Sequence, residues 1–368
     1  MSESPLYIGM LSGTSRDGVD AALVSFSGDT PTVLATRCDP YPPGLRRRLD
    51  ALLTPPRRPT PRAAFELDRP LADHFAATAL RLLADAALDA RAVAALGSHG
   101  QTVWHDPGRQ PPETLQLGDP QRIANRTGII TVGDFRRADV EAGGQGAPLA
   151  PLLHRVLFSR PGVTRAVLNL GGIANVSLLD GAGAVTGYDT GPANCLMDAW
   201  IRRHRRIDFD RDGAWAASVD PDPALLERLL ADPWFSRTPP KSTGIEYFNL
   251  DWLDARLGAQ PPDAATVQAT LCELTAASVA AALRSSAANE VLVCGGGVHN
   301  AHLLERLDAR LPGVAVRSTG AVGLDPDWIE AILFAWLARA RLADRTLDTR
   351  SITGAARPIR LGRIARPV

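Results

Sequence analysis

The most constraining feature of this chain is a local order that occurs twice: a short apolar segment, a small polar turn and a second apolar segment. Leu6–Leu11 precedes the turn of residues 12–18 and Val19–Phe26 follows it, whereas Ala166–Leu170 precedes a glycine turn that Asn175–Leu179 follows. Short apolar runs bounded by glycine and small polar residues are typical of buried strands. Each occurrence predicts a hairpin, and the repetition predicts two related α/β lobes.

Helical and strand patterns alternate along the rest of the chain. Helical spacing marks three stretches, which are Arg62–Ala95, Ala147–Phe158 and His302–Arg310. Short apolar runs that lead into glycine or a small polar turn mark strands at Val93–Gln101, Gly183–Tyr188 and Glu290–Cys294. Strands that alternate with helices of this length predict an α/β architecture.

A separate signal marks the start of the last long helix. Asp327 stands before Trp328, and Glu330 follows three residues after Asp327. This spacing is the pattern of a capping box, in which both side chains bond to main-chain N–H groups. It predicts a helix over Trp328–Leu342.

Size and composition indicate a globular protein with more than one domain. The 368 residues exceed what one compact core usually organises, and a cleft between two domains is a common place for a ligand. Hydrophobic residues make up 45% of the chain and charged residues 22%. These values argue against a disordered or fibrous protein.

The charges and cysteines exclude several classes of partner. The 40 Lys plus Arg balance the 40 Asp plus Glu, and clusters such as Arg46–Arg48 and Arg202–Arg206 stand beside no nucleic-acid motif, so we expect no nucleic-acid partner. The cysteines, at 38, 195, 272 and 294, show no paired spacing, which favours a reducing compartment. We expect no signal peptide and no apolar run of the roughly 18–20 residues that span a membrane, hence a cytoplasmic protein without a membrane partner.

Lys241 is the only lysine, so arginine supplies 39 of the 40 basic side chains. An ammonium group is a compact point charge, whereas a guanidinium group is a planar fork with several donors. Either this position needs the point charge or the lysine stands there by chance, and the sequence leaves both interpretations open.

The first polar turn has the composition of a phosphate-binding loop. Glycine in Ser12–Ser15 lets the backbone approach an anion, and the N–H groups and hydroxyls of this segment are available as donors. Asp17 and Asp20 could hold Mg²⁺ through its water ligands, because this ion keeps much of its hydration. The alternative is an ordinary Gly/Ser/Asp hairpin turn.

Two further motifs follow predicted strands. Asp189 opens the sequence Asp-Thr-Gly-Pro192 and could accept a proton or orient a nucleophile, although a turn or helix-capping aspartate is the alternative. Gly295–Gly297 would let a flat group such as adenine lie against bare backbone, whereas many α/β proteins carry glycines without that role. His99 could contact a sugar hydroxyl or be a structural histidine.

The order of these motifs is more specific than any one of them. A phosphate-loop hairpin, an Asp-Thr-Gly segment after a second hairpin and a strand that ends in three glycines follow one another here. This order resembles the two phosphate motifs and the adenosine motif of the superfamily that contains sugar kinases and actin. The flanking residues narrow the resemblance further.

The chain resembles the anhydro-N-acetylmuramic acid kinase family in ten segments that span nearly its whole length. They are residues 9–20, 97–102, 133–136, 143–149, 169–175, 189–194, 196–200, 240–244, 294–297 and 325–331. Leu11, Ala193 and Ile245 depart from the residues expected in the family. None of these departures removes a residue that the chemistry requires.

The resemblance implies a fold, a reaction and a set of ligands. The fold would be α/β, with two actin-like ATPase (ribonuclease H-like) lobes of mixed sheets flanked by helices and ATP in the interdomain cleft; one lobe would comprise residues 1–135 plus 350–368, the other 136–349. The reaction would open 1,6-anhydro-N-acetylmuramic acid with water and phosphorylate its O6, in peptidoglycan recycling. ATP, Mg²⁺ and a homodimer are implied as well.

The resemblance also assigns roles to individual residues. Asp189 would be the catalytic base, Asp17 and Asp20 would hold magnesium through water, and the sugar would be bound by His99, Gln101, Arg136 and Glu330, the last having a helix cap as its alternative role. The nucleotide-binding residues would be Gly13, Thr14, Ser15, Arg16, Asp17, Gly18, Val19, Asp20, Gly171, Gly172, Asn175, Gly191, Gly295, Gly296 and Gly297.

Two alternative functions share the predicted fold. One is another sugar or carboxylate kinase, which would phosphorylate an open sugar as readily as the anhydro form. The other is a non-catalytic protein switched by a nucleotide, such as an actin-like filament former or a repressor. A repressor of this fold is expected to carry an N-terminal DNA-binding extension, whereas this chain begins almost at its first predicted strand.

Overall fold

The computed structural model describes residues 4–13, 15–53, 58–284 and 286–368. The chain divides by its internal contacts into two compact units, one made of Met1–Leu157 with Trp328–Val368 and the other of Phe158–Asp327. The C-terminal segment therefore returns to the N-terminal unit. The domain limits expected from the sequence, after residues 135 and 349, stay a prediction.

A mixed sheet forms the centre of the N-terminal unit. Its strands are β1 (Leu6–Ser12), β2 (Gly18–Ser27), β3 (Thr30–Pro40), β4 (Val93–Asp106), β5 (Glu113–Leu117), β6 (Thr131–Gly133) and β12 (Arg363–Ala365). The order is β12-β6-β4-β1-β2-β3, and β5 pairs with β4. Strand β1 is antiparallel to β2 and parallel to β4, so the turn after β1 and the middle of β4 lie side by side.

Helices cover both faces of this sheet. They are α1 (Pro43–Leu53), α2 (Pro61–Asp85), α3 (Pro120–Thr127), α4 (Arg137–Glu141), α5 (Ala150–Phe158), α11 (Ile329–Leu342) and α12 (Arg350–Thr353). Ile8 and Met10 of β1 share a core with α2, whereas Gly9 between them contacts α11. Because side chains alternate along a strand, α2 and α11 lie on opposite faces.

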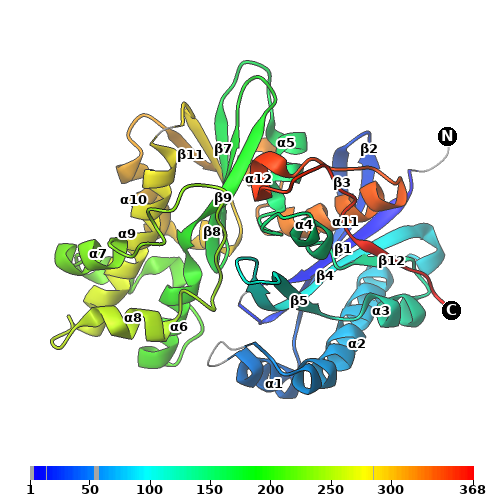
Figure 1. Cartoon of the computed structure of the whole chain (residues 1–368), viewed down its shortest axis with the longest axis horizontal. Coiled ribbons are helices and arrows are strands. Elements are labelled where there is room, and N and C mark those ends of the chain that lie inside the picture. Colours follow the sequence, from blue (N-terminus) through cyan, green and yellow to red (C-terminus); the bar gives the residue numbers. More distant parts are fainter. Residues whose placement is uncertain (1–3, 14, 54–57, 285) are drawn as a thin grey trace. The chain divides into compact units, whose positions relative to one another are not determined.

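Helix α11 approaches the sheet more closely than any side chain would allow. A Cβ atom at Gly9 would lie 1.8 Å from the carbonyl oxygen of Ala331, and one at Gly97 would lie 2.0 Å from that of Phe334. Figure 1 shows α11, in orange, against the blue and cyan strands β1 and β4, more than two hundred residues earlier in the chain. Two glycines on adjacent strands thus allow α11, which is distant in the sequence, to pack directly on the sheet.

The C-terminal unit contains a second mixed sheet, in the order β11-β10-β7-β8-β9. Its strands are β7 (Arg165–Leu170), β8 (Ile173–Leu179), β9 (Val185–Pro192), β10 (Glu290–Cys294) and β11 (Ala315–Ser318). Its helices are α6 (Asn194–Arg205), α7 (Pro223–Leu230), α8 (Leu250–Leu257), α9 (Ala264–Leu283) and α10 (Ala301–Arg310). Both hairpins predicted from the repeated pattern are present.

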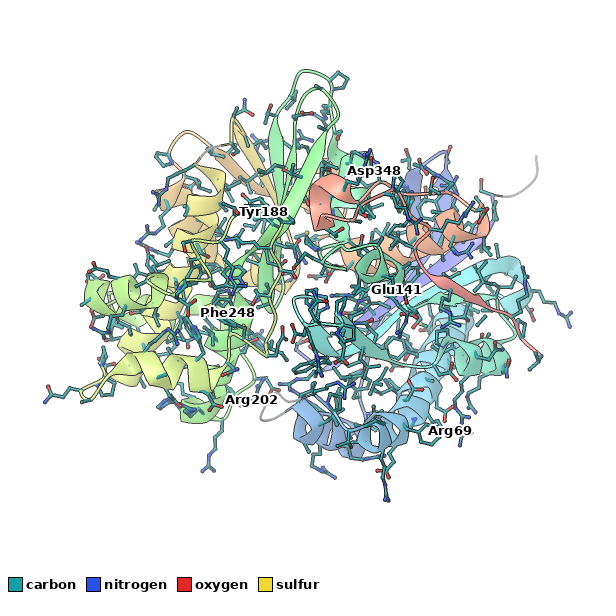
Figure 2. All side chains as sticks on the ribbon, viewed as in Figure 1. Arg69, Glu141, Tyr188, Arg202, Phe248 and Asp348 are labelled. Atoms are coloured by element: carbon teal, nitrogen blue, oxygen red, sulfur yellow. The ribbon has the colours of Figure 1, made fainter. Side chains whose placement is uncertain are left out.

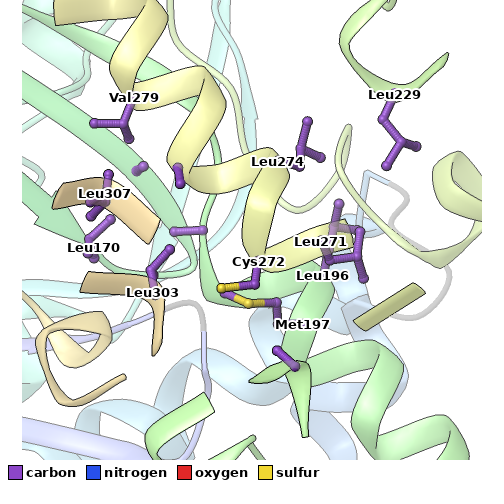
Figure 3. Close-up of a cluster of buried hydrophobic side chains, with 14 of the residues drawn as sticks. Leu170, Leu196, Met197, Leu229, Leu271, Cys272, Leu274, Val279, Leu303 and Leu307 are labelled. Carbon is purple, nitrogen blue, oxygen red and sulfur yellow. The ribbon is translucent and has the colours of Figure 1, made fainter. Parts of the chain in front are cut away.

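Helix α9 is the central helix of this unit. Figure 3 shows Leu271, Cys272 and Leu274 of α9 in one apolar cluster with Met197 of α6 and Leu303 of α10. Its 20 residues are long and apolar enough to cross a membrane, contrary to the expectation that no such stretch exists, but 83% of the most apolar window is buried inside the unit. Burial of most of the helix explains its high content of apolar residues.

The predicted α/β class with mixed sheets flanked by helices is confirmed, and three local predictions are wrong. Helix α2 ends at Asp85 because Ala87 has a left-handed backbone conformation, with φ 53°. Strand β9 continues through Pro192, so Asp189 lies within a strand and not in a turn after it. The capping box is absent, because the N-cap of α11 is Trp328, which makes no side-chain cap bond.

Substituting Gly9→Ala or Gly97→Ala should test the close packing of α11 on the sheet. A methyl group at either position would overlap main-chain atoms of the helix, so we expect the free energy of unfolding to fall by on the order of 3 kcal/mol or more. Gly44→Ala is the matched control, because a Cβ atom there meets nothing within 4 Å and alanine favours a helix. Urea titrations of the three variants give the comparison, and stability unchanged in Gly9→Ala would contradict the packing described.

Candidate active site

The loop between β1 and β2 is the predicted phosphate-binding element, and its ends are held by main-chain contacts. The N–H of Arg16 donates to the Gly13 carbonyl at 3.3 Å, and the N–H of Tyr41 donates to the Asp17 carbonyl at 2.9 Å. Arg16 has φ 56°, a left-handed conformation that few non-glycine residues adopt. Thr14, also predicted to bind the nucleotide, lies outside the described residues.

Close packing limits the residue type at the end of this loop. A Cβ atom at Gly18 would lie 2.4 Å from the Asp39 carbonyl oxygen, so glycine lets β2 begin against β3. The hydroxyl of Ser15 donates to Asp17 Oδ1 at 2.8 Å, and Ser15 and Asp17 are both exposed. The loop therefore offers an exposed hydroxyl and carboxylate on a backbone that is fixed at its base.

Asp17 and Asp20 both lie near the Cys38 thiol. Burial raises the pKa of the Cys38 thiol to about 12, and the negative charges of Asp20, its cross-strand partner, and of Asp17 raise it further. Within the described residues no group of three or more His, Cys, Asp or Glu side chains could hold a metal directly. Two carboxylates match the preference of Mg²⁺ for few protein ligands and several waters.

Gln101 connects the two central strands beneath the loop. Its Oε1 accepts from the Ser12 hydroxyl at 2.7 Å, and its Nε2 donates to the carbonyls of Gly13, at 3.3 Å, and Thr102, at 3.2 Å. The residue is 2% exposed. In this arrangement Gln101, predicted to bind the sugar, holds the start of the phosphate-loop candidate.

Arg136 lies beside two buried histidines. Its Nε donates to His99 Nε2 at 2.9 Å, and His99 Nδ1 in turn lies 3.1 Å from the Gly100 carbonyl oxygen. Burial, followed by the charge of Arg136, holds the pKa of His99 well below its ordinary value. The same two causes lower the pKa of His105 to about 3. Both imidazoles are therefore neutral at physiological pH.

Both ring nitrogens of His99 are occupied. The carbonyl of Gly100 can only accept, so Nδ1 carries the proton and Nε2 accepts from Arg136. The imidazole ring also packs on Phe334, with 4.7 Å between the centroids. His99 thus orients Arg136, which is well suited to binding an anionic group.

A buried carboxylate fixes the Gly143–Gly146 segment beside this group. Asp139 is fully buried and accepts from the Gly146 N–H at 2.7 Å and from the hydroxyls of Thr349 and Thr353 at 2.7 and 2.8 Å. A Cβ atom at Gly144 would lie 2.2 Å from the Asp139 carboxylate. Asp139 therefore joins the glycine segment to α12 of the C-terminal tail.

A pocket of about 320 Å³ lies beside β4, and His99 is among the residues that line it. Its wall includes Ser98, Asp68, Asp134 and Arg137, with the exposed ring of Phe65 at 65% accessibility. The Ser98 hydroxyl is buried and has no hydrogen-bond partner in the structure. Carboxylates, an unsatisfied hydroxyl and an exposed aromatic ring are groups that suit a polyhydroxylated ligand.

In the C-terminal unit, Gly295–Gly297 packs against the end of β7, which is distant in the sequence. A Cβ atom at Gly295 would lie 2.3 Å from Asn169 Oδ1, and one at Gly297 would lie 2.5 Å from the Leu170 side chain. At Gly296 a Cβ atom would meet nothing within 4 Å. The outer glycines are thus needed for packing on β7, whereas Gly296 leaves an open surface of bare backbone.

The turn between β7 and β8 accepts hydrogen bonds from the start of α6. The carbonyl of Gly172 accepts from the N–H groups of Ala193 and Cys195, and that of Gly171 accepts from the N–H of Asn194. These bonds satisfy donors that a helix start otherwise leaves unpaired. The two predicted nucleotide residues therefore have a structural role through their carbonyl oxygens.

Asp189 is 5% exposed and is held by main-chain groups on two sides. Its N–H donates to the Lys241 carbonyl at 3.1 Å, and its Oδ2 accepts from the Thr243 N–H at 2.8 Å. Tyr188, labelled in Figure 2, precedes it on β9 and donates its hydroxyl to the Ala282 carbonyl of α9. Neighbouring residues of β9 thus contact different elements, and Asp189 contacts the 241–243 loop.

Two residues next to this carboxylate, Asn175 and Thr243, have a buried polar atom without a hydrogen-bond partner. Asn175 pairs with Asp189 across β8 and β9, and its Oδ1 is buried without a hydrogen-bond partner. The hydroxyl of Thr243 is likewise buried and unpaired. Buried polar atoms usually have a partner, often an ordered water. The surroundings of Asp189 therefore fit a site for water or a hydroxyl group.

The structure thus gathers the predicted residues into two groups. Gln101, His99 and Arg136 lie in the same unit as the Gly13–Asp20 loop, and Gln101 contacts its first residue. The glycine segments, Asn175, Gly191 and Asp189 lie in the other unit. Glu330 begins α11. Sequence reasoning missed His105, Asp139 and Thr243. His105 lies in the part of β4 beyond Gln101, where the predicted strand ended. The Thr243 contact is made by a main-chain N–H and leaves no signal in the residue type.

Comparisons with known proteins agree with this arrangement. The family model described as anhydro-N-acetylmuramic acid kinase matches residues 5–367. Proteins of that name from Xanthomonas axonopodis pv. citri and Xanthomonas oryzae pv. oryzae are 53% and 52% identical, over 98% of this chain and 98% and 97% of their own lengths. Among solved structures, component A of the (R)-2-hydroxyglutaryl-CoA dehydratase of Acidaminococcus fermentans is 11% identical with a TM-score of 0.49, covering 92% of this chain and all of that one.

The neutral histidines predict a pH dependence of stability. His105 has a pKa of about 3 in the fold and about 6.5 when unfolded, so its stabilising contribution is complete above pH 6.5 and is lost as the pH falls towards 3. Between pH 7 and 5 the free energy of unfolding should fall by about 2 kcal/mol for this residue. The variant His105→Gln should show a correspondingly smaller fall in urea titrations, and an unchanged dependence would contradict the neutral assignment.

Proposed function

The chain belongs to the anhydro-N-acetylmuramic acid kinase family, and from this premise we propose that it opens 1,6-anhydro-N-acetylmuramic acid with water and transfers a phosphoryl group from ATP to O6. The products are N-acetylmuramic acid 6-phosphate and ADP. The observation that carries the proposal is the buried carboxylate of Asp189, fixed by main-chain groups and surrounded by polar atoms without partners. The two alternative functions are not favoured, because relatives at about 50% identity over nearly the whole chain bear the kinase name.

The substrate sets an unusual chemical demand. O6 is bonded to C1 as an internal acetal, so it carries no proton that a base could remove, and it becomes a nucleophile only when the C1–O6 bond breaks. In an inverting glycosidase a carboxylic acid protonates the departing oxygen while a carboxylate activates water on the other side. Here the departing O6 bonds to the γ-phosphorus, and the phosphoryl group takes the place of the acid's proton.

Asp189 acts as the general base in this scheme. It removes a proton from the water whose oxygen attacks C1, as the electron pair of the C1–O6 bond passes to O6 and the bond from γ-phosphorus to ADP breaks. A base of this kind must be ionised and fixed in direction. The Thr243 N–H favours the ionised form, because a donor to a carboxylate stabilises its charge.

The remaining predicted residues bind the ligands. The Gly13–Asp20 loop holds the phosphates, and Gly296 offers the bare surface for the nucleoside. Asp17 and Asp20 would hold Mg²⁺ through its water ligands. Arg136, oriented by His99, binds the lactyl carboxylate or a phosphate, and Glu330 binds a sugar hydroxyl. Magnesium supplies charge neutralisation at the phosphates when bound.

The chemistry of the substrate also supports a biological role for the protein. An anhydro amino sugar of this kind comes from peptidoglycan turnover, so the proposed role is in cell-wall recycling in the cytoplasm. A homodimer is part of the proposal and rests on the family resemblance. Sedimentation of the purified protein measures that state directly.

The variant Asp189→Asn tests the proposal. It keeps the size of the side chain and its ability to accept from Thr243 but cannot take the proton, so kcat for the anhydro sugar should fall by at least about a thousandfold, the order expected for loss of general base catalysis. Binding of ATP, measured by calorimetry, should stay within about threefold of the original. The matched control is Asp212→Asn, an exposed carboxylate of the same unit. An Asp189→Asn protein with more than about a tenth of the original rate would remove Asp189 as the base.

A further inference from the structure

Lys241 lies in the segment that holds Asp189, and its ammonium group has two partners. Nζ stands 4.5 Å from the centroid of the Trp234 ring and donates to the Phe235 carbonyl at 3.2 Å. The side chain is half-buried. A cation over an indole face is attracted to the ring electrons, more strongly when it is partly desolvated. The charge at the end of the lysine side chain is therefore fixed in place.

The surface beneath the ammonium group is rigid. Trp234 is 1% exposed and packs edge-on against Phe235 and Phe248, with centroids 5.5 and 5.3 Å away. The main-chain N–H of Trp234 donates to Asp232 Oδ1 at 2.8 Å. The same carboxylate accepts from the Tyr247 hydroxyl at 2.8 Å and from Trp252 Nε1 at 2.9 Å. Asp232 and the aromatic rings thus anchor the start of the segment that leads to Lys241.

The same segment contacts β9 at three points. The carbonyl of Lys241 accepts from the Asp189 N–H, and the Thr243 N–H donates to the Asp189 carboxylate. At Gly191 a Cβ atom would lie 2.8 Å from Cε1 of Phe235, so the phenyl ring rests on bare backbone. The residues that bind the ammonium group and the residues that hold Asp189 are therefore parts of one short loop.

We propose that Lys241 is a positioning residue for Asp189. Its ammonium group closes the loop between Phe235 and Lys241, which fixes the two main-chain contacts on Asp189, and its positive charge favours the ionised carboxylate. Arginine serves at the 39 other basic positions of this chain. A planar guanidinium group is larger and spreads its charge over several donors, so it cannot reproduce a single charge between an indole face and one carbonyl. This inference rests on the proposed role of Asp189 as the base.

The electrostatic surroundings agree with this role. Burial lowers the pKa of Lys241, the negative charge of Asp189 raises it, and Arg237 lowers it. Asp189 and Arg237 are thus the charged groups that act on the ammonium group. Arg237 is exposed in the same loop, which makes it a matched control for the loss of one positive charge.

Kinetic measurements separate the positioning of Asp189 by the loop from the effect of the Lys241 charge on its ionisation. Lys241→Met removes the charge and keeps an unbranched apolar chain, so kcat should fall on the order of tenfold to a hundredfold, as a displaced catalytic group predicts. The acidic limb of its pH–rate profile should move to higher pH by roughly half a unit to one unit, because the carboxylate loses a nearby cation. Lys241→Arg should lower kcat but leave the limb in place, and Arg237→Met should change neither.

A measurement without turnover keeps the inference independent of the reaction. Protein grown with ¹⁵Nζ,¹³Cε-lysine contains one labelled ammonium group, so its titration by NMR belongs to Lys241 alone. In Asp189→Asn the midpoint should fall by roughly half a pH unit or more, since an attractive charge is lost, whereas Asp212→Asn should leave it unchanged.

The outcomes distinguish this inference from the proposed function. An unchanged Lys241 midpoint in Asp189→Asn, or a Lys241→Met enzyme with the original kcat and acidic limb, would overturn the positioning role. A shifted midpoint together with full turnover by Asp189→Asn would instead leave the contact in place and remove Asp189 as the base.

Discussion

Two hydrogen bonds to main-chain groups fix Asp189, and the proposed function of this protein depends on them. The Asp189 carboxylate, almost fully buried in β9, accepts from the Thr243 N–H, and the main-chain N–H of the same residue donates to the Lys241 carbonyl. Taking a charge out of water is costly unless fixed donors replace the lost hydration. The loop that supplies this donor is anchored in turn by Asp232 and a cluster of aromatic rings. A buried carboxylate that keeps one direction is the result.

The N-terminal unit uses neutral groups to direct a charged one. His99 and His105 are buried beside Arg136, and its charge helps to keep both imidazoles unprotonated. An unprotonated His99 can accept from the guanidinium group, which a protonated ring could not do. Beneath them, glycines at positions 9 and 97 allow α11 to sit directly on the strands. The position of the Arg136 side chain thus follows from burial and close packing.

The sequence indicated the fold and most of the site through residue types that have few alternative uses. Glycine turns after apolar runs predicted both hairpins, and Asp-Thr-Gly drew attention to Asp189. Other features were inaccessible, because the Thr243 contact uses a main-chain N–H that every residue except proline carries. The helix expected over Arg62–Ala95 was too long because a left-handed alanine gives no sign in composition. The capping box failed because Asp327 bonds to His299 instead.

The position of an oxygen label tests the central claim most directly. In ¹⁸O-enriched water the account predicts one heavy oxygen at C1 of the sugar phosphate and none in the phosphoryl group or at O6, because water attacks C1 while O6 attacks phosphorus. The product must be read promptly by mass spectrometry, beside unlabelled product kept in the same water to measure exchange at C1. Heavy oxygen in the phosphoryl group, or at O6, would contradict the account.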